Sequence, residues 1–478
     1  MDRKAIAICL PVALWCAAGL YATEASIRNP QARAFYQKAI EYGDKGLWDP
    51  AILELNRARQ LEADNPQILI QLGIAYGERR EWKQAVASLR KAVAIAPASV
   101  EAHYNLALTL DRADPGKGAG TLEYRQALKL NPRHVDSLIN LAINAGDRDA
   151  AEARRLFARA IRLDPKNAKA RLNLALLLKR ESEDDASVAE FREAIQLDPN
   201  LVEARRQLAA VLMAQKHWAE VVNECREILK RDPDDAGSRY TLGEALSRDG
   251  KVEEGRSELE RARLLRKRAQ QQQDAGRLQA QGIRDLKRGI LSEARKALTA
   301  AVELDGSAAN RMYLGLALAA SGDMKAAIKE LTTAIDLDPK NARAHSNLAS
   351  VYLQAGQDYL AQTELDKALQ IDPWLAEAHN NLGLILIRNQ EAEKAIDHFR
   401  MAAEVSPEYV EAHFNLALAL RAAGRFDDAV RAFRRAAELS PRNAQIHQAL
   451  GLTLQDKGDV AGARAALDRA AALESRAK

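Results

Sequence analysis

Proline recurs in this chain at a fixed interval, and that interval constrains the fold more than any other feature of the sequence. Two runs of prolines are evenly spaced: Pro165, Pro199 and Pro233, and then Pro339, Pro373, Pro407 and Pro441. A constant period of about 34 residues is typical of repeat proteins, in which each unit buries its apolar face by stacking on its neighbours. The sequence therefore predicts a stacked array rather than a set of globular domains.

Each repeat has the pattern of a helix hairpin. In the repeat 376–409, apolar and small residues recur at helical spacing over 379–386, which predicts a first helix. Residues 389–390 interrupt the pattern as a turn. A second helical pattern follows over 395–402 and ends before Pro407, because the residue that precedes a proline is disfavoured in a helix.

Composition agrees with closely packed helices and gives little sign of a charged partner. Apolar residues make up 47% of the 478 residues and aromatic residues only 5%, so the core must be built mainly from Ala and Leu, which favour helices. The net charge of +4 is too small over this length to indicate a nucleic-acid partner. Cys225 is the only cysteine outside the first 25 residues, which excludes a disulfide framework.

Residues 1–25 have the pattern of an export signal. Arg3 and Lys4 form a basic start, and the apolar run 5–22 follows. The alternative is an uncleaved anchor helix, because about 18 apolar residues are just enough to span a bilayer. We therefore expect an exported protein, periplasmic or secreted; the alternative is a membrane-anchored protein whose repeats lie outside the cytoplasm. Only this segment, if uncleaved, would contact the membrane.

The order of residue types in each repeat resembles the tetratricopeptide repeat. The shared pattern is an apolar residue, then Leu-Gly or Leu-Ala, an aromatic residue or Leu, and then Ala, Phe or Leu, Ala and Pro at set offsets. Position 1 denotes the first residue of each repeat. Thirteen repeats can be placed, beginning near residues 32, 66, 100, 135, 168, 202, 236, 275, 308, 342, 376, 410 and 444.

This resemblance implies an all-α fold: a right-handed superhelical solenoid of about 13 helix hairpins, whose first helices line a concave groove. Proteins of this family usually bind extended peptides or partner helices in that groove as scaffolds or adaptors, and they are not catalytic on their own. We therefore expect other proteins as partners. The alternative function is an accessory subunit of a glycosyltransferase or of a polysaccharide synthesis or export machine, which similar arrays accompany. The signal and the Ala/Arg-rich composition indicate a bacterial protein.

Asparagine at position 6 is the candidate binding feature. Positions 2, 6, 9 and 13 lie on the side of the first helix that faces away from the second helix. A carboxamide offers one acceptor and two donors, so exposed asparagines can bind the backbone of an extended ligand. The alternative is that Asn is common at this position in tetratricopeptide repeats whether or not anything binds. The six candidates, in two groups, are Asn105, Asn140 and Asn173, and Asn347, Asn381 and Asn415.

Other chemistry is not expected. The histidines that recur at position 4 lie one repeat apart, about 8–10 Å, whereas ligands of one metal converge to about 2.0–2.1 Å from it. We therefore expect no metal site and interpret these residues as half-buried groups at the hairpin interface. The sequence contains no catalytic or phosphate-binding motif, so neither an enzyme nor a cofactor is predicted. These histidines are His103, His345, His379, His413 and His447.

The period slips in the middle of the chain. The spacing from Pro233 to Gly306 exceeds two repeats by five positions, and the segment 260–282 consists largely of strong helix formers. We therefore expect the second helix of the seventh repeat to continue past its usual end. The predicted result is two arms, 32–269 and 275–477, joined by a helical linker, 270–274.

Basic residues gather around this junction. Residues 261–297 hold eleven Lys and Arg against three acidic residues. The segment is either a solvated charged helix face or a patch for an anionic partner or a membrane surface. A nucleic-acid partner rests on this stretch alone and conflicts with export, so none is predicted.

Overall fold

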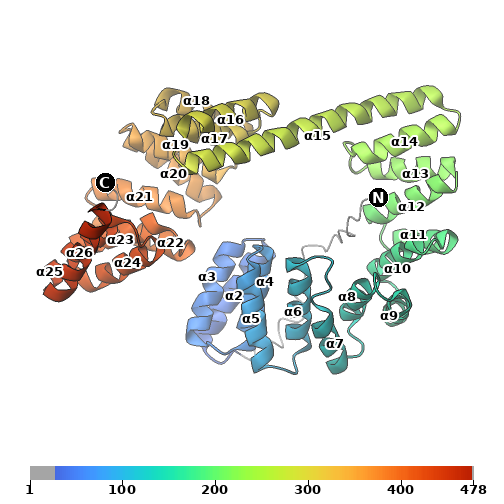
Figure 1. Cartoon of the computed structure of the whole chain (residues 1–478), viewed down its shortest axis with the longest axis horizontal. Helices are drawn as coiled ribbons and strands as arrows, with labels where there is room; N and C mark the ends of the chain where they lie inside the picture. Colours follow the sequence, from blue (N-terminus) through green and yellow to red (C-terminus); the bar gives the residue numbers. More distant parts are fainter. Residues whose placement is uncertain (1–26, 476–478) are drawn as a thin grey trace. The chain divides into compact units, whose positions relative to one another are not determined.

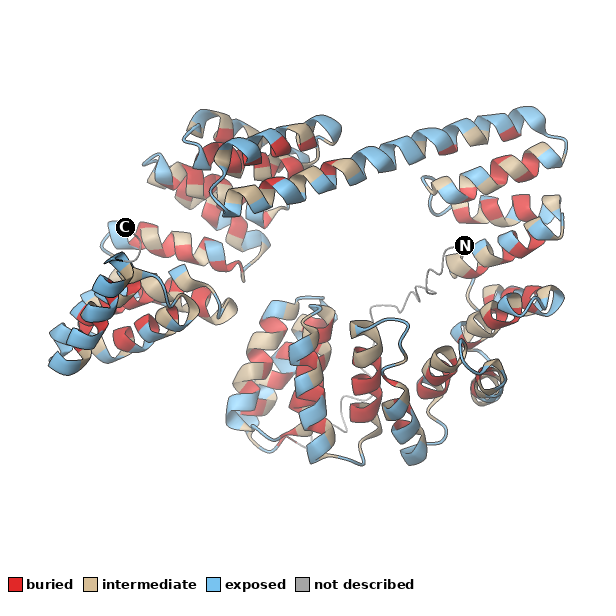
Figure 2. Ribbon diagram, viewed as in Figure 1, coloured by how far each residue is buried: buried red, intermediate tan, exposed pale blue. Residues whose placement is uncertain are grey.

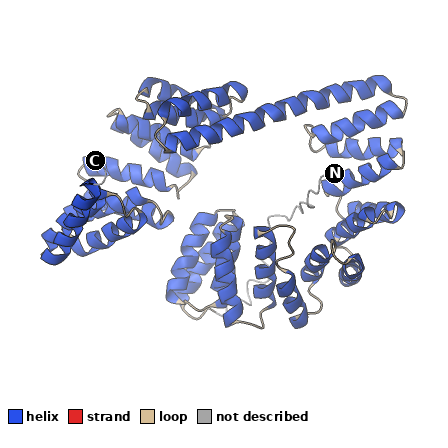
Figure 3. Cartoon of the chain, viewed as in Figure 1, coloured by secondary structure: helices blue, strands red, loops and turns tan. Residues whose placement is uncertain are grey.

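The computed structural model describes residues 27–475, and their regular structure is entirely helical, with no strand in that range (Figures 1 and 3). This confirms the all-α prediction. The predicted signal, residues 1–25, lies outside the described residues. The helices up to the middle of the chain are α2 (Pro30–Asp44), α3 (Trp48–Leu61), α4 (Pro66–Glu78), α5 (Trp82–Ile95), α6 (Val100–Ala113), α7 (Thr121–Leu130), α8 (Val135–Ala145), α9 (Ala150–Leu163), α10 (Ala168–Arg180), α11 (Asp184–Leu197), α12 (Val202–Ala214), α13 (Trp218–Leu229) and α14 (Ala236–Arg248). They are followed by α15 (Val252–Lys287), α16 (Leu291–Leu304), α17 (Ala308–Ala320), α18 (Met324–Leu337), α19 (Ala342–Gln354), α20 (Asp358–Ile371), α21 (Ala376–Arg388), α22 (Ala392–Val405), α23 (Val410–Ala422), α24 (Phe426–Leu439), α25 (Ala444–Lys457) and α26 (Val460–Ser475).

Consecutive helices pair as hairpins, which we number in chain order. In every hairpin that does not involve α15, the first helix packs on the second helix that follows it, from α2 with α3 in hairpin 1 to α25 with α26 in hairpin 13. The beginning of α15 is the second helix of hairpin 7, and its end is the first helix of hairpin 8. The thirteen predicted repeats therefore correspond to thirteen hairpins in the described range, α2 to α26.

Two local features fix where the helices of a hairpin begin and end. Asn341 starts α19, because its side chain accepts a hydrogen bond of 3.1 Å from the amide of Ala344. The turn between the two helices requires a left-handed residue, which glycine adopts without strain: Gly356 has φ +71° and Gly424 has φ +73°. In hairpin 11 that position is Gln390, with φ +65°.

Close approach of the two helices depends on a small residue at position 8. A Cβ added to Gly383 would lie 2.6 Å from Cε1 of Phe399, which occupies position 24 of the same hairpin. Six hairpins have glycine at position 8, and in all six an added Cβ would overlap the position-24 side chain: Gly73, Gly243, Gly282, Gly315, Gly383 and Gly451. The periodic Leu-Gly pair in the sequence therefore reflects direct helix contact.

Internal contacts divide the chain into two compact units, and the division falls between Arg268 and Ala269, inside α15. We call the part up to Arg268 the first unit and the part from Ala269 the second unit. The predicted continuation of the second helix of hairpin 7 is confirmed, since α15 is a single helix of 36 residues. The bounds of the two predicted arms and of their linker stay a prediction.

The middle of α15 is exposed. All side chains from 266 to 273 are exposed or nearly so, and Ala262 and Ala275 on either side of them are buried (Figure 2). Asp274 accepts hydrogen bonds from Gln270, at 3.1 Å, and from Arg277. This stretch is therefore held mainly by helix propensity and local side-chain pairs.

No helix in the described range is both long enough and apolar enough to cross a membrane.

Candidate protein-binding surface

Successive first helices lie against one another. In the second unit, α17 contacts α19, α19 contacts α21, α21 contacts α23 and α23 contacts α25. Each of them directs one side to its second helix: in α23, Ala412 and Leu416 at positions 3 and 7 are buried, whereas Glu411 and Leu418 at positions 2 and 9 are exposed. The first helices therefore form a continuous layer whose outer side carries positions 2 and 9, as the helical spacing predicts.

The expectation that the position-6 asparagines are exposed was wrong. Asn105 is buried, with 7% of its surface exposed. The other five, Asn140, Asn173, Asn347, Asn381 and Asn415, are half-buried. The physical reason is that position 6 also borders the first helix of the preceding hairpin, which covers part of the side chain.

Four of the six carboxamides form hydrogen bonds within the protein. The Nδ2 groups of Asn105 and Asn173 donate to backbone carbonyls four residues earlier, at 3.0 and 2.8 Å. Asn140 donates to the hydroxyl of Tyr104 at 3.5 Å, and Asn415 donates to Oδ1 of Asn380 at 2.9 Å. The last two bonds join position 6 of one hairpin to position 5 of the hairpin before it. Hydrogen bonding within the protein therefore accounts for these four asparagines without a bound ligand.

Asn347 and Asn381 differ from the others, because within residues 27–475 their side chains form no hydrogen bond. They hold the same position in two neighbouring hairpins of the second unit. Apolar side chains on the adjoining first helices remain exposed: Ile387 by 40%, Leu418 by 39% and Leu452 by 38%. We call Asn347, Asn381, Ile387, Leu418 and Leu452 the second-unit face.

The first unit carries a longer row of carboxamides than the asparagines alone suggested. Position 6 holds an amide side chain in six consecutive hairpins: Gln37, Gln71, Asn105, Asn140, Asn173 and Gln207. Gln207 continues the row after Asn173, and Gln37 and Gln71 extend it at the other end; none of the three is among the six asparagines predicted from the sequence. The sequence signal that would have included the glutamines is that Gln carries the same donor and acceptor groups as Asn.

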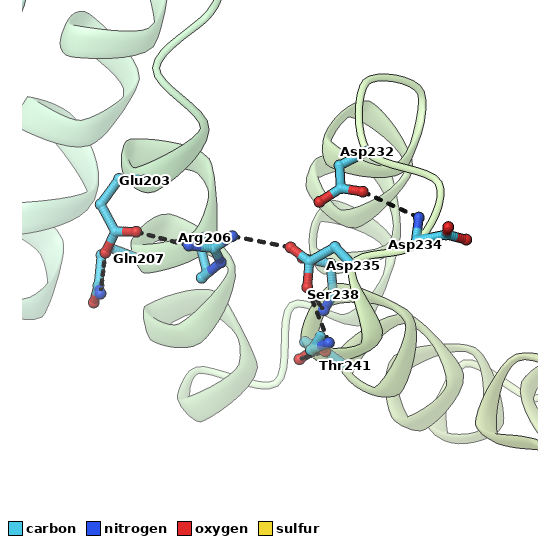
Figure 4. A network of polar contacts seen from close by, with 9 residues as sticks. Glu203, Arg206, Gln207, Asp232, Asp234, Asp235, Ser238 and Thr241 are labelled. Atoms are coloured by element: carbon cyan, nitrogen blue, oxygen red, sulfur yellow. Dashed lines mark hydrogen bonds and ion pairs between the residues drawn. The ribbon is translucent and has the colours of Figure 1, made fainter. Parts of the chain in front are cut away.

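Gln207, at the end of this row, already forms hydrogen bonds with other side chains of the protein. Lys179 donates to Gln207 Oε1 at 2.6 Å, and Gln207 donates to Glu203 at 2.7 Å. Arg206 bridges Glu203 and Asp235, at 2.9 Å to each (Figure 4). Burial tends to raise the pKa of Asp235, but hydrogen bonds from Ser238 and Arg206 outweigh it and hold the pKa below its usual value. These groups connect α12 to the start of α14.

An ion pair recurs inside the hairpins. It joins position 4 of the first helix to the residue opposite it on the second helix, which is usually position 23. The pairs are Arg171–Glu190, at 3.0 Å, Arg205–Glu224, at 2.6 Å, Arg239–Glu258, at 2.6 Å, Arg311–Glu330, at 2.7 Å, His103–Glu123, at 2.5 Å, and His345–Glu364, at 2.5 Å. We call this pair the interior clasp. It agrees with the predicted interface role of the histidines. The missed sequence signal was the recurrence of Glu at this spacing after Arg or His at position 4.

The histidine clasps show why a cation suits position 4. His345 Nε2 lies 3.3 Å from the carbonyl oxygen of Pro339, which can only accept, and Nδ1 lies 2.5 Å from Glu364. Both hydrogen bonds are satisfied when the ring carries two protons. Burial tends to raise the pKa of Glu364, but hydrogen bonds from Lys367 and His345 outweigh this and lower the pKa.

Hairpin 11 has a histidine on both sides of the clasp. Nδ1 of His379 lies 2.9 Å from Nδ1 of His398, and Nε2 of His379 donates to the carbonyl of Pro373 at 3.0 Å. Burial lowers the pKa of both rings, and the pKa of His398 is lowered further by the nearby His379. No group of three or more potential metal ligands occurs in the described part of the chain.

Family models match most of the chain. A model described as tetratricopeptide repeat matches residues 70–133, 144–202, 280–331 and 414–477, which together make up half of the chain. Two further models with that description match residues 342–373 and 374–442, and a model described as TPR repeat matches residues 315–356.

Several solved structures are similar to this chain, whereas no curated protein matches its sequence. The crystal structure of the APC/C hetero-tetramer Cut9–Hcn1 is 16% identical over 94% of this chain and 95% of that chain, with a TM-score of 0.41. The crystal structure of MamA is 26% identical over 34% and 95% of the two chains, with a TM-score of 0.31. PilF of Pseudomonas aeruginosa is 20% identical over 41% and 90%, with a TM-score of 0.37.

Proposed function

Because this chain belongs to the tetratricopeptide repeat family, we propose that it is a non-enzymatic scaffold that binds a segment of another protein on its second-unit face. Repeats of this family generally mediate binding to other proteins and are typically not catalytic. The proposal adds to that general role a specific surface, on α19, α21, α23 and α25, and a location outside the cytoplasm.

The observation that carries the proposal is the combination of exposed apolar side chains with two carboxamides that lack hydrogen bonds within the described residues. Leu418 and Leu452 offer apolar contact, and Asn347 and Asn381 offer donors and acceptors. Neighbouring first helices lie about 8–10 Å apart, which is close to the length of three residues of an extended chain at about 3.3 Å each. An extended segment can therefore meet both carboxamides while its side chains contact the leucines.

The proposed location rests on the sequence of residues 1–25, with its basic start and its apolar run. The alternative role, as an accessory subunit of a glycosyltransferase or a polysaccharide machine, would give the same surface a different partner. The identity of the bound protein separates the two.

Site-specific crosslinking in the native host tests the surface. Benzoylphenylalanine in place of Leu418 should capture a partner, and the same probe in place of Leu360 on α20 is the control. The two leucines are similarly exposed, by 39% and 42%, but Leu360 is on a second helix. Equal capture at both sites would contradict the proposed surface. Recovery of the full chain only from the cytoplasm would contradict the location.

Titration with the captured partner tests the two carboxamides. The double variant Asn347→Ala, Asn381→Ala should weaken binding by roughly tenfold or more, because each lost hydrogen bond contributes about 0.5–1.5 kcal/mol. The matched control is Asn105→Ala with Asn173→Ala, whose carboxamides already bond to their own helices. An equal loss of affinity in both double variants would remove the specific role of Asn347 and Asn381.

A further inference from the structure

Hairpins 12 and 13 of the second unit have histidine at position 4 but alanine in place of the acid of the interior clasp. In hairpin 12, position 4 is His413 and position 23 is Ala432, which is buried. His413 Nε2 lies 3.1 Å from the carbonyl oxygen of Pro407, so this nitrogen donates, as in the other histidine hairpins. Nδ1 of His413, which in hairpin 10 would meet a glutamate, has no hydrogen-bond partner within residues 27–475.

A cavity of about 390 Å³, widely open to solvent, lies between α22 and the two helices of hairpin 12. His413, Leu416 and Leu420 of α23 line it together with Ala432 of α24, and residues of α22 complete the wall. The residues from α23 hold positions 4, 7 and 11. They are therefore on the opposite side of that helix from Leu418, which belongs to the second-unit face.

The remaining lining is mostly cationic. Two carboxylates, Glu404 and Asp428, also line the cavity. Asp428 pairs with two of the arginines, at 3.1 Å from Nη2 of one of them. The arginines of the lining are 40% or more exposed, and each pairs with at least one carboxylate: Arg400 with Asp397 at 2.8 Å, Arg425 and Arg431 with Asp428, and Arg435 with Glu438 at 3.2 Å. A guanidinium carries five N–H donors, so donors remain for a further carboxylate. The arginines are Arg400, Arg425, Arg431 and Arg435.

We propose that this cavity binds the carboxylate of a glutamate or aspartate side chain from a partner protein, in the place of the missing clasp acid. His413 donates from Nδ1 once it is protonated, and the surrounding arginines supply further donors. The same chemistry operates within the chain at His345 and Glu364, where the carboxylate comes from the second helix. The site is separate from the second-unit face and does not depend on the proposed function.

Two further observations favour a carboxylate. Burial lowers the pKa of His413 and the nearby Arg435 lowers it further, and together they outweigh the opposing effects of the Pro407 carbonyl and Glu408. The only hydrogen bond of this ring within residues 27–475 is the one from Nε2, so Nδ1 is open to a carboxylate, which would raise the pKa of the ring. The wall beside the ring consists of Leu416, Leu420 and Ala432, which suits the short apolar stem of an acidic side chain.

Nuclear magnetic resonance of the full chain with labelled histidine tests the site with propionate, which has the carboxylate and stem of glutamate. The His413 signal, identified by its loss in His413→Gln, should shift saturably with propionate in roughly the millimolar range. The neutral isostere propionamide, at the same concentration and ionic strength, should leave the signal unchanged. No shift at saturating propionate, or an equal shift with propionamide, would overturn the proposal.

Restoring the acid provides the decisive variant. Ala432→Glu should occupy the cavity from within, so the affinity for propionate should fall at least tenfold while the pKa of His413 rises. Hairpin 13 offers the matched control, because His447 there faces Ala466 in the same register. Ala466→Glu should leave the response of His413 intact. Undiminished propionate binding in Ala432→Glu, or a response to phosphate alone, would refute carboxylate binding at this position.

Discussion

At the scale of single residues, the pair of groups at the interior clasp makes hairpin 11 sensitive to pH. Where the clasp is formed, position 4 is either arginine or histidine, and the acid opposite accepts from either. In hairpin 11 the acid is replaced by His398, so the neutral rings of His379 and His398 share one hydrogen bond between their Nδ1 atoms. Protonation of both rings would place two positive charges 2.9 Å apart. The pair is therefore stable only while at least one ring is neutral.

The first prediction concerns this pair. Both rings have a lowered pKa, so the folded state binds fewer protons than the unfolded state below the usual histidine pKa of about 6.5. The free energy of unfolding should therefore fall as the pH drops from about 6.5 through the lowered values. His398→Glu restores an acid opposite His379, and at pH 5.5 it should be more stable than the native chain by on the order of 1 kcal/mol.

Chemical denaturation at a series of pH values measures this effect. Asp366, Asp372 and Asp397 also act on the two rings, and all three are retained in the variant. The reverse substitution in hairpin 10, Glu364→His, should introduce the same loss of stability at low pH. Identical pH profiles for the native chain and His398→Glu would show that the pair does not control stability in this range.

At the scale of elements, a hairpin is determined by the distance between its two helices. Position 8 sets this distance, because Gly383 allows the ring of Phe399 to approach the backbone of α21. The left-handed turn residue and the extended residue before each proline then fix where the helices stop. Asp372, before Pro373, has φ −130° and ψ 94°.

The second prediction compares two glycines in helices. Gly383→Ala should destabilise the second unit by roughly 1–3 kcal/mol, because the new Cβ would lie 2.6 Å from Phe399 and the helices must move apart. Gly276→Ala on α15 is the control: no atom lies within 4 Å of the new Cβ, so helix propensity alone should stabilise by about 0.5–1 kcal/mol. Denaturant unfolding measures both, and the same sign for the two variants would contradict the packing argument.

At the scale of the whole molecule, contacts cluster within two units, and the division between them falls inside one helix. In repeat arrays each hairpin contacts mainly its neighbours, so stability is approximately a sum of local terms. The exposed stretch 266–273 of α15 provides little packing through which a change in one unit could stabilise the other. We therefore expect the two units to unfold separately.

The third prediction tests this separation with two matched core residues. Phe399, 1% exposed, and Phe191, 0% exposed, hold position 24 in the second and first units. Either residue changed to Ala should cost about 3–5 kcal/mol in its own unit. Hydrogen exchange measured by mass spectrometry should show faster exchange in the second unit for Phe399→Ala and in the first unit for Phe191→Ala. A loss of protection in both units from either variant would indicate a single cooperative array.

The sequence by itself determined the local architecture, since hairpins, turns and stacking follow from periodic patterns within a single repeat. The recurring Leu-Gly pair, the proline period and the slip between Pro233 and Gly306 were sufficient to predict thirteen hairpins and the continuous helix α15. Tertiary structure decided which polar side chains keep their donors and acceptors free of hydrogen bonds within the described residues. Asn105 and Asn347 have the same position, yet one bonds to its own helix and the other forms no hydrogen bond within the described residues. Burial and hydrogen bonding of a surface residue depend on the neighbouring helix, and a repeating pattern within one chain segment does not contain that information.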